Sequence, residues 1–204
     1  MTNPLSLASG VLPEFGAVTV IEAVCAAGFD AAGIWVEPGE WSAADTRASR
    51  AALEFGIFTE VKNLAKARTI VAAVAHPLAA ILIDPIHADR CGSTVAEIAA
   101  VDPALRPYAQ FCDARGARPD RADSDAIIID AIDLREQCGE GALPLTAMLA
   151  ALPKNLPLSI ELRSRALREA YADPFARARL VAGTTRGWRG GSANLDRLLS
   201  GFSA

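Results

Sequence analysis

The sequence has few histidines and no closely paired cysteines. Its 204 residues include two histidines, His76 and His87, so a site built from three or more imidazoles is excluded. The four cysteines form no Cys-x-x-Cys pair, which excludes a zinc knuckle and a dithiol redox motif of that kind. We interpret them as free thiols, which are typical of a reducing compartment, and therefore expect a cytoplasmic protein.

The chain also lacks an excess of positive charge and a long apolar run. Lys and Arg together number 20, against 24 for Asp and Glu, so the net charge is negative. The chain as a whole therefore does not attract nucleic-acid phosphates or anionic lipids. The longest apolar stretch, residues 70–83, contains His76 and Pro77 and is shorter than the ~20 residues that cross a bilayer. No basic segment followed by an apolar run opens the sequence, so we expect no secretory signal, no membrane partner and no nucleic-acid partner.

What the sequence does contain is a regular alternation of short apolar runs and amphipathic segments. This alternation is typical of an α/β fold with parallel strands. We predict six strands, at residues 5–9, 31–36, 52–55, 79–83, 107–111 and 158–162. Helices are predicted at about 19–28, 41–49, 60–75 and 145–152, after Thr94, and from Pro174 with Asp173 as its cap. Two capping boxes support these assignments, Thr19 with Glu22 and Thr94 with Glu97.

Two segments do not follow the alternation. Residues 113–142 are rich in charge and are predicted to be one long irregular loop, which in a compact domain is more often functional than a spacer. Residues 183–204 are predicted to be a loosely attached C-terminal tail with a short helix. The main domain is accordingly assigned to residues 1–182.

Polar side chains follow the predicted buried strands at their C-terminal ends. They are Glu54, Asp84 with His87, Gln110 with Asp113, and Glu161 with Arg163. In a parallel α/β barrel these ends converge on one pocket. A carboxylate within an apolar run costs several kcal/mol to bury unless an ion pair or a cation compensates it. Glu54, Asp84 and Glu161, with Gln110 or His87, form an oxygen-rich set suited to Mg²⁺, Mn²⁺ or Co²⁺.

In their order and spacing these motifs resemble a known family. The series LEF, ILIDPIH, YAQFCD, GEG followed by LPL, and LSIE resembles the C-terminal half of the xylose isomerase-like sugar phosphate isomerase/epimerase family of TIM barrels. Residues 5–50 resemble the first two βα units of that family. The resemblance, which spans residues 1 to about 182, implies an incomplete (β/α) barrel of about six units. The predicted helix at 41–49 leads directly into the predicted strand at 52–55, which resembles the fifth strand of the family. The resemblance therefore leaves no segment for the third and fourth units.

The resemblance also implies roles for single residues. A divalent metal would be held by Glu54, Asp84, Gln110 and Glu161, and Glu54 and Glu161 would also move protons. Gln110 stands where the family has a metal-binding histidine, and an amide oxygen is the weaker ligand. Substrate binding is assigned to His87, Asp113, Glu37 and Arg163.

The implied activity is isomerisation or epimerisation of a sugar, a sugar phosphate or a related keto-polyol through an enediolate. A dehydratase or lyase that uses the same enediolate, and a non-catalytic barrel remnant or binding protein, remain open, as does a homo-oligomer. A structural interpretation also remains open for each polar residue. Glu161 could pair with Arg163 or Arg135, Asp84 could start a turn before Pro85, and Asp113 could hold its own loop. His87 could be a surface histidine.

Overall fold

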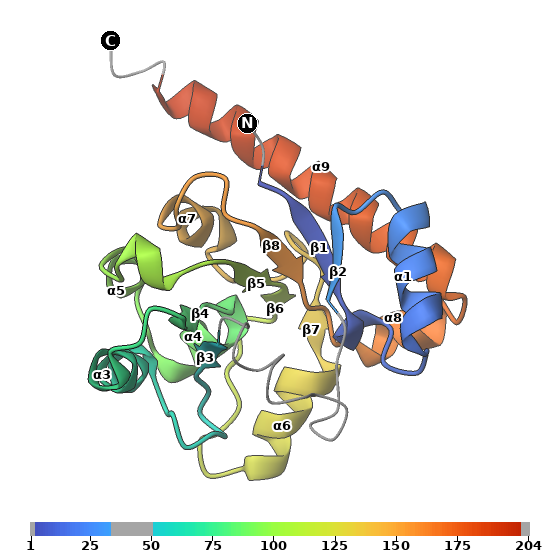
Figure 1. Cartoon of the computed structure of the whole chain (residues 1–204). Coiled ribbons are helices and arrows are strands. Elements are labelled where there is room, and N and C mark those ends of the chain that lie inside the picture. The colour runs from blue at the N-terminus through green and yellow to red at the C-terminus, as the bar shows by residue number, and fades with distance from the viewer. Residues whose placement is uncertain (1–2, 34–50, 201–204) are drawn as a thin grey trace.

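The computed structural model of the chain describes residues 3–33 and 51–200 (Figure 1). Its main sheet is parallel, with the strand order β2-β1-β8-β5. These strands are β1 (Leu5–Ala8), β2 (Ala31–Gly33), β5 (Ala109–Phe111) and β8 (Leu158–Ile160). A second parallel pair joins β3 (Ala51–Glu54) to β4 (Ala79–Leu82).

The two sheets continue one another. A parallel bridge links Ile83 to Ala109, and the Gln110 N–H donates to the Ile83 carbonyl at 2.9 Å. The strands therefore form one arc in the order β2-β1-β8-β5-β4-β3. Within the described residues the arc does not close into a barrel, which confirms the predicted incomplete parallel barrel. Each predicted strand segment contributes to it. Residues 34–36, the predicted helix at 41–49 and Glu37 lie outside the described residues.

Helices surround the arc (Figure 1). They are α1 (Ala17–Ala26), α3 (Leu64–Val74), α4 (Pro85–Cys91), α5 (Val95–Ala99), α6 (Ser124–Asp133), α7 (Leu145–Ala150), α8 (Arg165–Ala170) and α9 (Pro174–Ser200). Short 3-10 turns cover Ser9–Val11 and Pro103–Leu105. No helix in the described part of the chain is both long and apolar enough to span a membrane.

The two faces of the arc differ in the size and polarity of their side chains. Leu7, Phe111 and Ile160 belong to the buried hydrophobic core between the strands and the helices. Successive side chains of a strand point to opposite faces, so their neighbours Ser6, Gln110 and Ser159, which lie in register, share the inner face. They line a cavity of about 320 Å³. The inner face is therefore less filled than the packed interior of a complete barrel.

One predicted capping box is confirmed and the other is wrong. The Thr94 hydroxyl accepts from the Glu97 N–H, and the Glu97 carboxylate accepts from the Thr94 N–H, at the start of α5. By contrast, α1 begins at Ala17 after Gly16, so Thr19 already lies within the helix. A cap needs non-helical backbone, and nothing in the two residues before Thr19 prevents them from being helical.

The segment predicted to be an irregular loop contains regular structure. An antiparallel pair, β6 (Asp113–Ala114) and β7 (Arg135–Glu136), flanks α6. The α6 helix starts where the Asp123 carboxylate accepts from the Ala126 N–H. The prediction was wrong because a run of charged residues was interpreted as a loop, although it contains a helix cap.

The predicted loose tail is also wrong, since α9 runs unbroken for 27 residues from Pro174 through the expected boundary at residue 182. Its start is as predicted, with the Asp173 carboxylate accepting from the Phe175 N–H. Its later turns pack on the domain, because Arg186 donates to the Ala27 carbonyl and the Trp188 ring lies 5.9 Å from that of Phe111.

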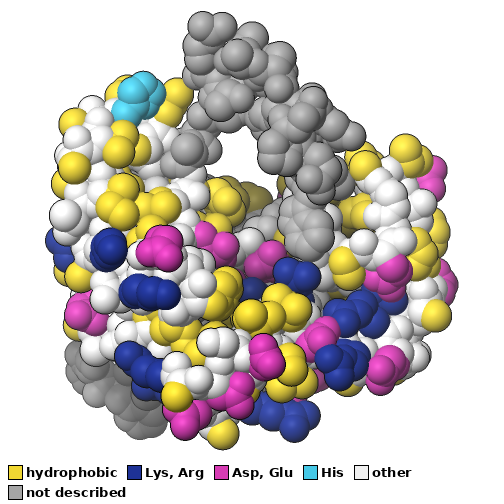
Figure 2. All heavy atoms as spheres, turned by 90° about the horizontal axis from the view of Figure 1, so that it is seen from below, with side chains coloured by type: hydrophobic (Ala, Val, Ile, Leu, Met, Phe, Trp, Pro, Cys, Tyr) yellow, Lys and Arg dark blue, Asp and Glu magenta, His cyan; other side chains and the backbone are white. Residues whose placement is uncertain are grey.

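Figure 2 shows one surface of the whole molecule, on which acidic and basic side chains are interspersed.

Candidate functional site

Four of the predicted site residues lie where neighbouring parallel strands end. Glu54 is the last residue of β3, and Asp84 follows β4 as the N-cap of α4. His87 lies in the first turn of α4, and Glu161 directly follows β8. Asp84 is fixed by its own helix, because its Oδ1 accepts from the Ile86 N–H at 3.0 Å. The Asp-Pro sequence therefore starts a helix and at the same time turns the second carboxylate oxygen toward the site.

Glu54, Asp84 and His87 form a compact group of potential metal ligands. One ligand atom from each residue lies within 4.8 Å of the other two. The His87 Nε2 is 3.6 Å from Glu54 Oε1 and 4.0 Å from Asp84 Oδ2. The Asp84 side chain is fully buried, whereas the Glu54 side chain retains 41% of its surface accessible. The group thus opens to solvent on the Glu54 side.

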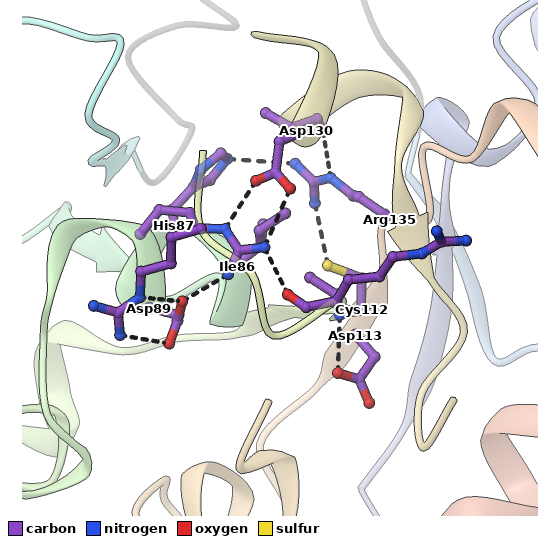
Figure 3. Close-up of polar contacts among 12 residues, drawn as sticks. Ile86, His87, Asp89, Cys112, Asp113, Asp130 and Arg135 are labelled. Carbon is purple, nitrogen blue, oxygen red and sulfur yellow. Dashed lines mark hydrogen bonds and ion pairs between the residues drawn. The ribbon is translucent and has the colours of Figure 1, made fainter. Parts of the chain in front are cut away.

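Arg135, the first residue of β7, connects Glu161 to this group. Its Nη1 lies 2.7 Å from Asp84 Oδ2 and 3.1 Å from Glu161 Oε2. Its Nη2 is 3.3 Å from His87 Nε2. In Figure 3 the guanidinium lies between His87 and Cys112, whose Sγ is 3.5 Å from Nη1. The alternative in which Glu161 pairs with Arg135 is therefore realised.

The site contains three carboxyl groups, those of Glu54, Asp84 and Glu161, and one guanidinium, that of Arg135. Burial, followed by the charges of Asp84 and Glu161, raises the pKa of Glu54 to about 8. Burial also raises the pKa of Glu161, although Arg135 opposes that shift. Burial alone would raise the pKa of Asp84 as well. The charge and the hydrogen bond of Arg135 outweigh burial, so the pKa of Asp84 is lowered. One guanidinium therefore does not compensate three carboxyl groups.

His87 is buried in surroundings that disfavour its charged form. Burial lowers its pKa below the usual value, and the charge of Asp84 opposes this only in part. The ring is packed edge-on against Phe58 at a centroid distance of 5.3 Å. A neutral ring whose Nε2 faces the Arg135 guanidinium acts as an acceptor there. His87 is thus a buried member of the site rather than a surface histidine.

Gln110 lies on the inner face of the arc, in the cavity that also contains Glu161 and Ser159. Its Oε1 is buried and accepts no hydrogen bond from any described residue. Such an oxygen has lost its hydration, so a cation or a donor group on a ligand would restore its missing partner. Glu54, Asp84 and His87 are absent from the lining of this cavity, as far as the described residues go. Glu161 is the residue that the two parts of the site share.

Neither Asp113 nor Arg163, both predicted to bind substrate, belongs to the group of Glu54, Asp84 and His87. The Asp113 carboxylate accepts from the N–H groups of Ala114, Gly139 and Leu143, so it holds the GEG turn, as in its structural alternative. Arg163 lines a different cavity, of about 680 Å³, together with Glu14 and Arg168. Glu37 lies outside the described residues.

Two residues of the site were not assigned to it from the sequence. The sequence suggests Arg135 only as an ion-pair partner of Glu161, and Cys112 only as one of four free thiols. The Cys112 thiol is 3.8 Å from Asp84 Oδ1, and burial followed by the charge of Asp84 keeps its pKa well above the usual value. An arginine four residues before the GEG turn was the available signal for Arg135.

Comparison with known proteins identifies the fold. No protein-family model and no curated protein matches the chain. Among solved structures, a xylose isomerase-like TIM barrel/4-hydroxyphenylpyruvate dioxygenase fusion protein matches 88% of the chain with a TM-score of 0.69 and 15% identity. The chain has the fold of the xylose isomerase-like TIM barrels. The predicted resemblance is confirmed at this level.

Two further structures have the same fold. The IolI protein with a bound zinc atom matches 93% of the chain with a TM-score of 0.57 and 16% identity. A xylose isomerase domain protein from Alicyclobacillus acidocaldarius subsp. acidocaldarius matches 71% with a TM-score of 0.55 and 22% identity. The chain covers 41% of the fusion protein, 76% of IolI and 52% of the Alicyclobacillus protein. The chain therefore spans less than two thirds of the length of the fusion protein and of the Alicyclobacillus protein.

Proposed function

We propose that this chain is a divalent-metal-dependent isomerase or epimerase that acts on a sugar, a sugar phosphate or a related keto-polyol. The observation that carries the proposal is the convergence of Glu54, Asp84, His87 and Glu161 at the ends of strands in a xylose isomerase-like arc. Support also comes from IolI, a structure of similar fold that contains a zinc atom.

The chemistry of the donor set fits a divalent cation. A divalent cation would favour the ionised form of Glu54, whose pKa is raised to about 8, and would give the buried Gln110 Oε1 a partner. Glu54, Asp84 and Glu161 would hold it, with Gln110 or His87 as the neutral ligand. Mn²⁺, Mg²⁺ or Co²⁺ in this position would polarise the substrate carbonyl and the adjacent hydroxyl group.

The proton transfers fall to the two glutamates. One removes the proton next to the substrate carbonyl, and the other returns a proton to the same or to the neighbouring carbon. Return to the same carbon from the opposite face gives an epimer, and return to the neighbouring carbon gives an isomer. His87 would orient a substrate hydroxyl, because its neutral ring can exchange hydrogen bonds without changing the charge of the site.

A second candidate is a non-catalytic remnant of the barrel. The observation in its favour is the open arc, because a wall that complete barrels have is absent among the described strands. Both proposals agree on the fold but differ on the metal. A dehydratase would share the metal and the enediolate, so it is separated from the isomerase by its product.

The deciding experiment is a calorimetric titration of the EDTA-treated protein with Mn²⁺. We expect one site per chain that Glu161→Gln weakens, since this variant keeps the shape of the side chain but removes its charge. The matched control is Glu136→Gln, because Glu136 pairs with the exposed Arg115 and is not one of the potential metal ligands. A folded parent protein that takes up no Mn²⁺, Mg²⁺ or Co²⁺ would establish the remnant instead.

A further inference from the structure

We infer that Arg135 is the resident cation of the candidate site and that a divalent metal must compete with its guanidinium for Asp84 and His87. The inference rests on the proposed metal site and deepens it. In the metal-free protein the ion pairs of Arg135 stabilise the site. The affinity of the site for a metal is therefore lower than it would be without Arg135. The observation behind the inference is that the guanidinium lies within hydrogen-bond distance of both Asp84 and His87. Figure 3 shows its contact with His87.

Two of the three potential ligand atoms are already engaged by Arg135. The Asp84 Oδ2 receives Nη1 at 2.7 Å, and the His87 Nε2 receives Nη2 at 3.3 Å. The other Asp84 oxygen accepts from the Ile86 N–H, so this carboxylate has no oxygen without a donor. A metal ion that used Asp84 and His87 together would have to take the lone pairs that the guanidinium now uses.

The guanidinium is held in this position by the backbone around it. Its Nε donates to the Ala131 carbonyl at 2.6 Å, and Nη1 also donates to the Glu161 carbonyl at 3.1 Å. The Arg135 N–H donates to the carbonyl of Arg163, which follows the end of β8 by three residues. The side chain is 3% exposed, so no solvent competes for its donors. Arg135 is therefore preorganised, and its withdrawal would break several buried bonds at once.

The charges explain why such a cation is needed when no metal is bound. Asp84 is fully buried and Glu161 is 11% exposed, and each lies within an ion-pair distance of Arg135. Burying two carboxylates without a counter-charge is strongly unfavourable. One guanidinium with several donors satisfies both, as no single ammonium group does, because of its fixed fork geometry. Arg135 thus supplies the counter-charge for Asp84 and Glu161 when no metal is bound.

The test compares Arg135→Gln, Arg135→Lys and Arg163→Gln with the parent protein. Arg135→Gln removes the competing charge, and Arg135→Lys keeps a charge without the fork. Arg163→Gln is the control, because it also removes one positive charge. Arg163, like Arg135, favours the ionised form of Glu161. Mn²⁺ alone is titrated into each EDTA-treated protein by calorimetry, and thermal unfolding is followed in EDTA and in Mn²⁺.

We expect Arg135→Gln to bind Mn²⁺ more tightly than the parent by about 10- to 100-fold, the scale of one or two lost charge-assisted hydrogen bonds. Arg163→Gln should change the affinity far less. In EDTA, Arg135→Gln should unfold at a lower temperature than Arg135→Lys and the parent, and Mn²⁺ should restore more of its stability. Equal or weaker Mn²⁺ binding by Arg135→Gln, or an equal gain in Arg163→Gln, overturns the competition.

The outcomes separate this inference from the proposed function. If neither the parent nor Arg135→Gln binds Mn²⁺, the metal site itself is wrong. If the parent binds Mn²⁺ and Arg135→Gln binds no tighter, the metal site stands and the inference fails. Should Arg135→Gln not fold, the Arg135 side-chain Nε–H signal of the ¹⁵N-labelled parent is followed during titration with diamagnetic Zn²⁺. A shift that saturates with the bound metal supports displacement, and an unchanged signal at saturation overturns it.

Discussion

Buried charge decides which polar residues of this chain can be exchanged without loss of structure. Asp84 and Arg135 are both buried, and each satisfies the other. Removing one partner of such a pair leaves an uncompensated charge and typically costs about 3–5 kcal/mol. Glu161 differs, since it pairs with the same guanidinium but also lines the inner cavity. Removing the charge of Glu161 therefore costs less stability, because Arg135 still pairs with Asp84.

This difference gives a prediction for Glu161→Gln. We expect the variant to fold and to lose turnover by roughly 10²–10⁴-fold, the usual contribution of a general base. The measurement is the rate on a sugar or keto-polyol that the parent converts, with circular dichroism to verify the fold. Glu136→Gln serves as the control and should retain the parent rate. Full activity of Glu161→Gln would exclude this carboxylate as a proton carrier.

The residues of the site were predictable to the extent that a local pattern exposes them. Glu54, Asp84 and Glu161 each end a run of apolar residues, so their position at a strand end follows from the sequence. Arg135 has no such context, because it follows α6 in a segment that was predicted to be irregular. Its contacts with Asp84 and His87 span 51 and 48 residues of sequence, a separation that no local pattern encodes.

A second prediction at the residue scale concerns Gly141. A Cβ at this position would lie 2.4 Å from Asp113 Oδ1 and 2.5 Å from the Ala114 carbonyl oxygen. Because the backbone there cannot move easily, Gly141→Ala should destabilise the protein by about 1–3 kcal/mol, the usual cost of overpacking. Gly187→Ala is the matched control, since a Cβ in this part of α9 has no atom within 4 Å and alanine favours helix. Urea unfolding that ranks the two variants equally would contradict the crowding at Gly141.

At the scale of elements, helix starts were predicted correctly where the cap is defined by several residues together. The Asp173-Pro174 start of α9 and the Thr94-Glu97 start of α5 are examples. The end of α9 was not predictable in the same way. Four glycines between residues 183 and 191 suggest a flexible tail, yet contacts of Arg186 and Trp188 with distant parts of the chain hold the helix in place. Tertiary packing overrode local propensity here.

The junction between α6 and α8 supplies a pH-dependent prediction. Hydrogen bonds from Arg168 and Arg165 lower the pKa of Asp133 below its usual value. A lowered folded pKa stabilises the protein above the unfolded pKa of about 3.9, and this contribution is lost as the pH falls through the folded value. Asp133→Asn should therefore be less stable than the parent at pH 7 by at most about 1 kcal/mol, because the pairs are partly solvated.

The measurement is urea unfolding of both proteins across the acidic range. The gap between Asp133→Asn and the parent should narrow as the pH falls below 4, and it should shrink in high salt at pH 7. A gap that stays constant down to the lowest pH at which both proteins fold would mean that Asp133 acts through packing rather than through charge.

At the scale of the whole molecule, the parallel fold followed from the sequence but the order of its strands did not. The alternation of apolar runs and helices predicts parallel neighbours. That β1 lies between β2 and β8 depends on contacts across 153 residues, of which the Asn3 amide donating to the Leu156 carbonyl is one. In a complete barrel the first and last strands are neighbours, and β1 and β8 pair in the same way.

The order of the strands predicts how their amides exchange with solvent. Strands β1 and β8 each have a hydrogen-bonded neighbour on both sides, whereas β2 and β3 each pair with one strand within the described residues. Local opening costs least at sheet edges. Hydrogen exchange followed by mass spectrometry should therefore show the strongest protection in Leu5–Ala8 and Leu158–Ile160, and weaker protection in Ala31–Gly33 and Ala51–Glu54. The same exchange measurement at two protein concentrations shows whether the edge strands are free or covered by a second chain. Protection of β2 and β3 that disappears on dilution indicates that a second copy of the chain covers the open arc. Protection of both strands equal to that of β1 and β8 at every concentration would contradict an open edge altogether.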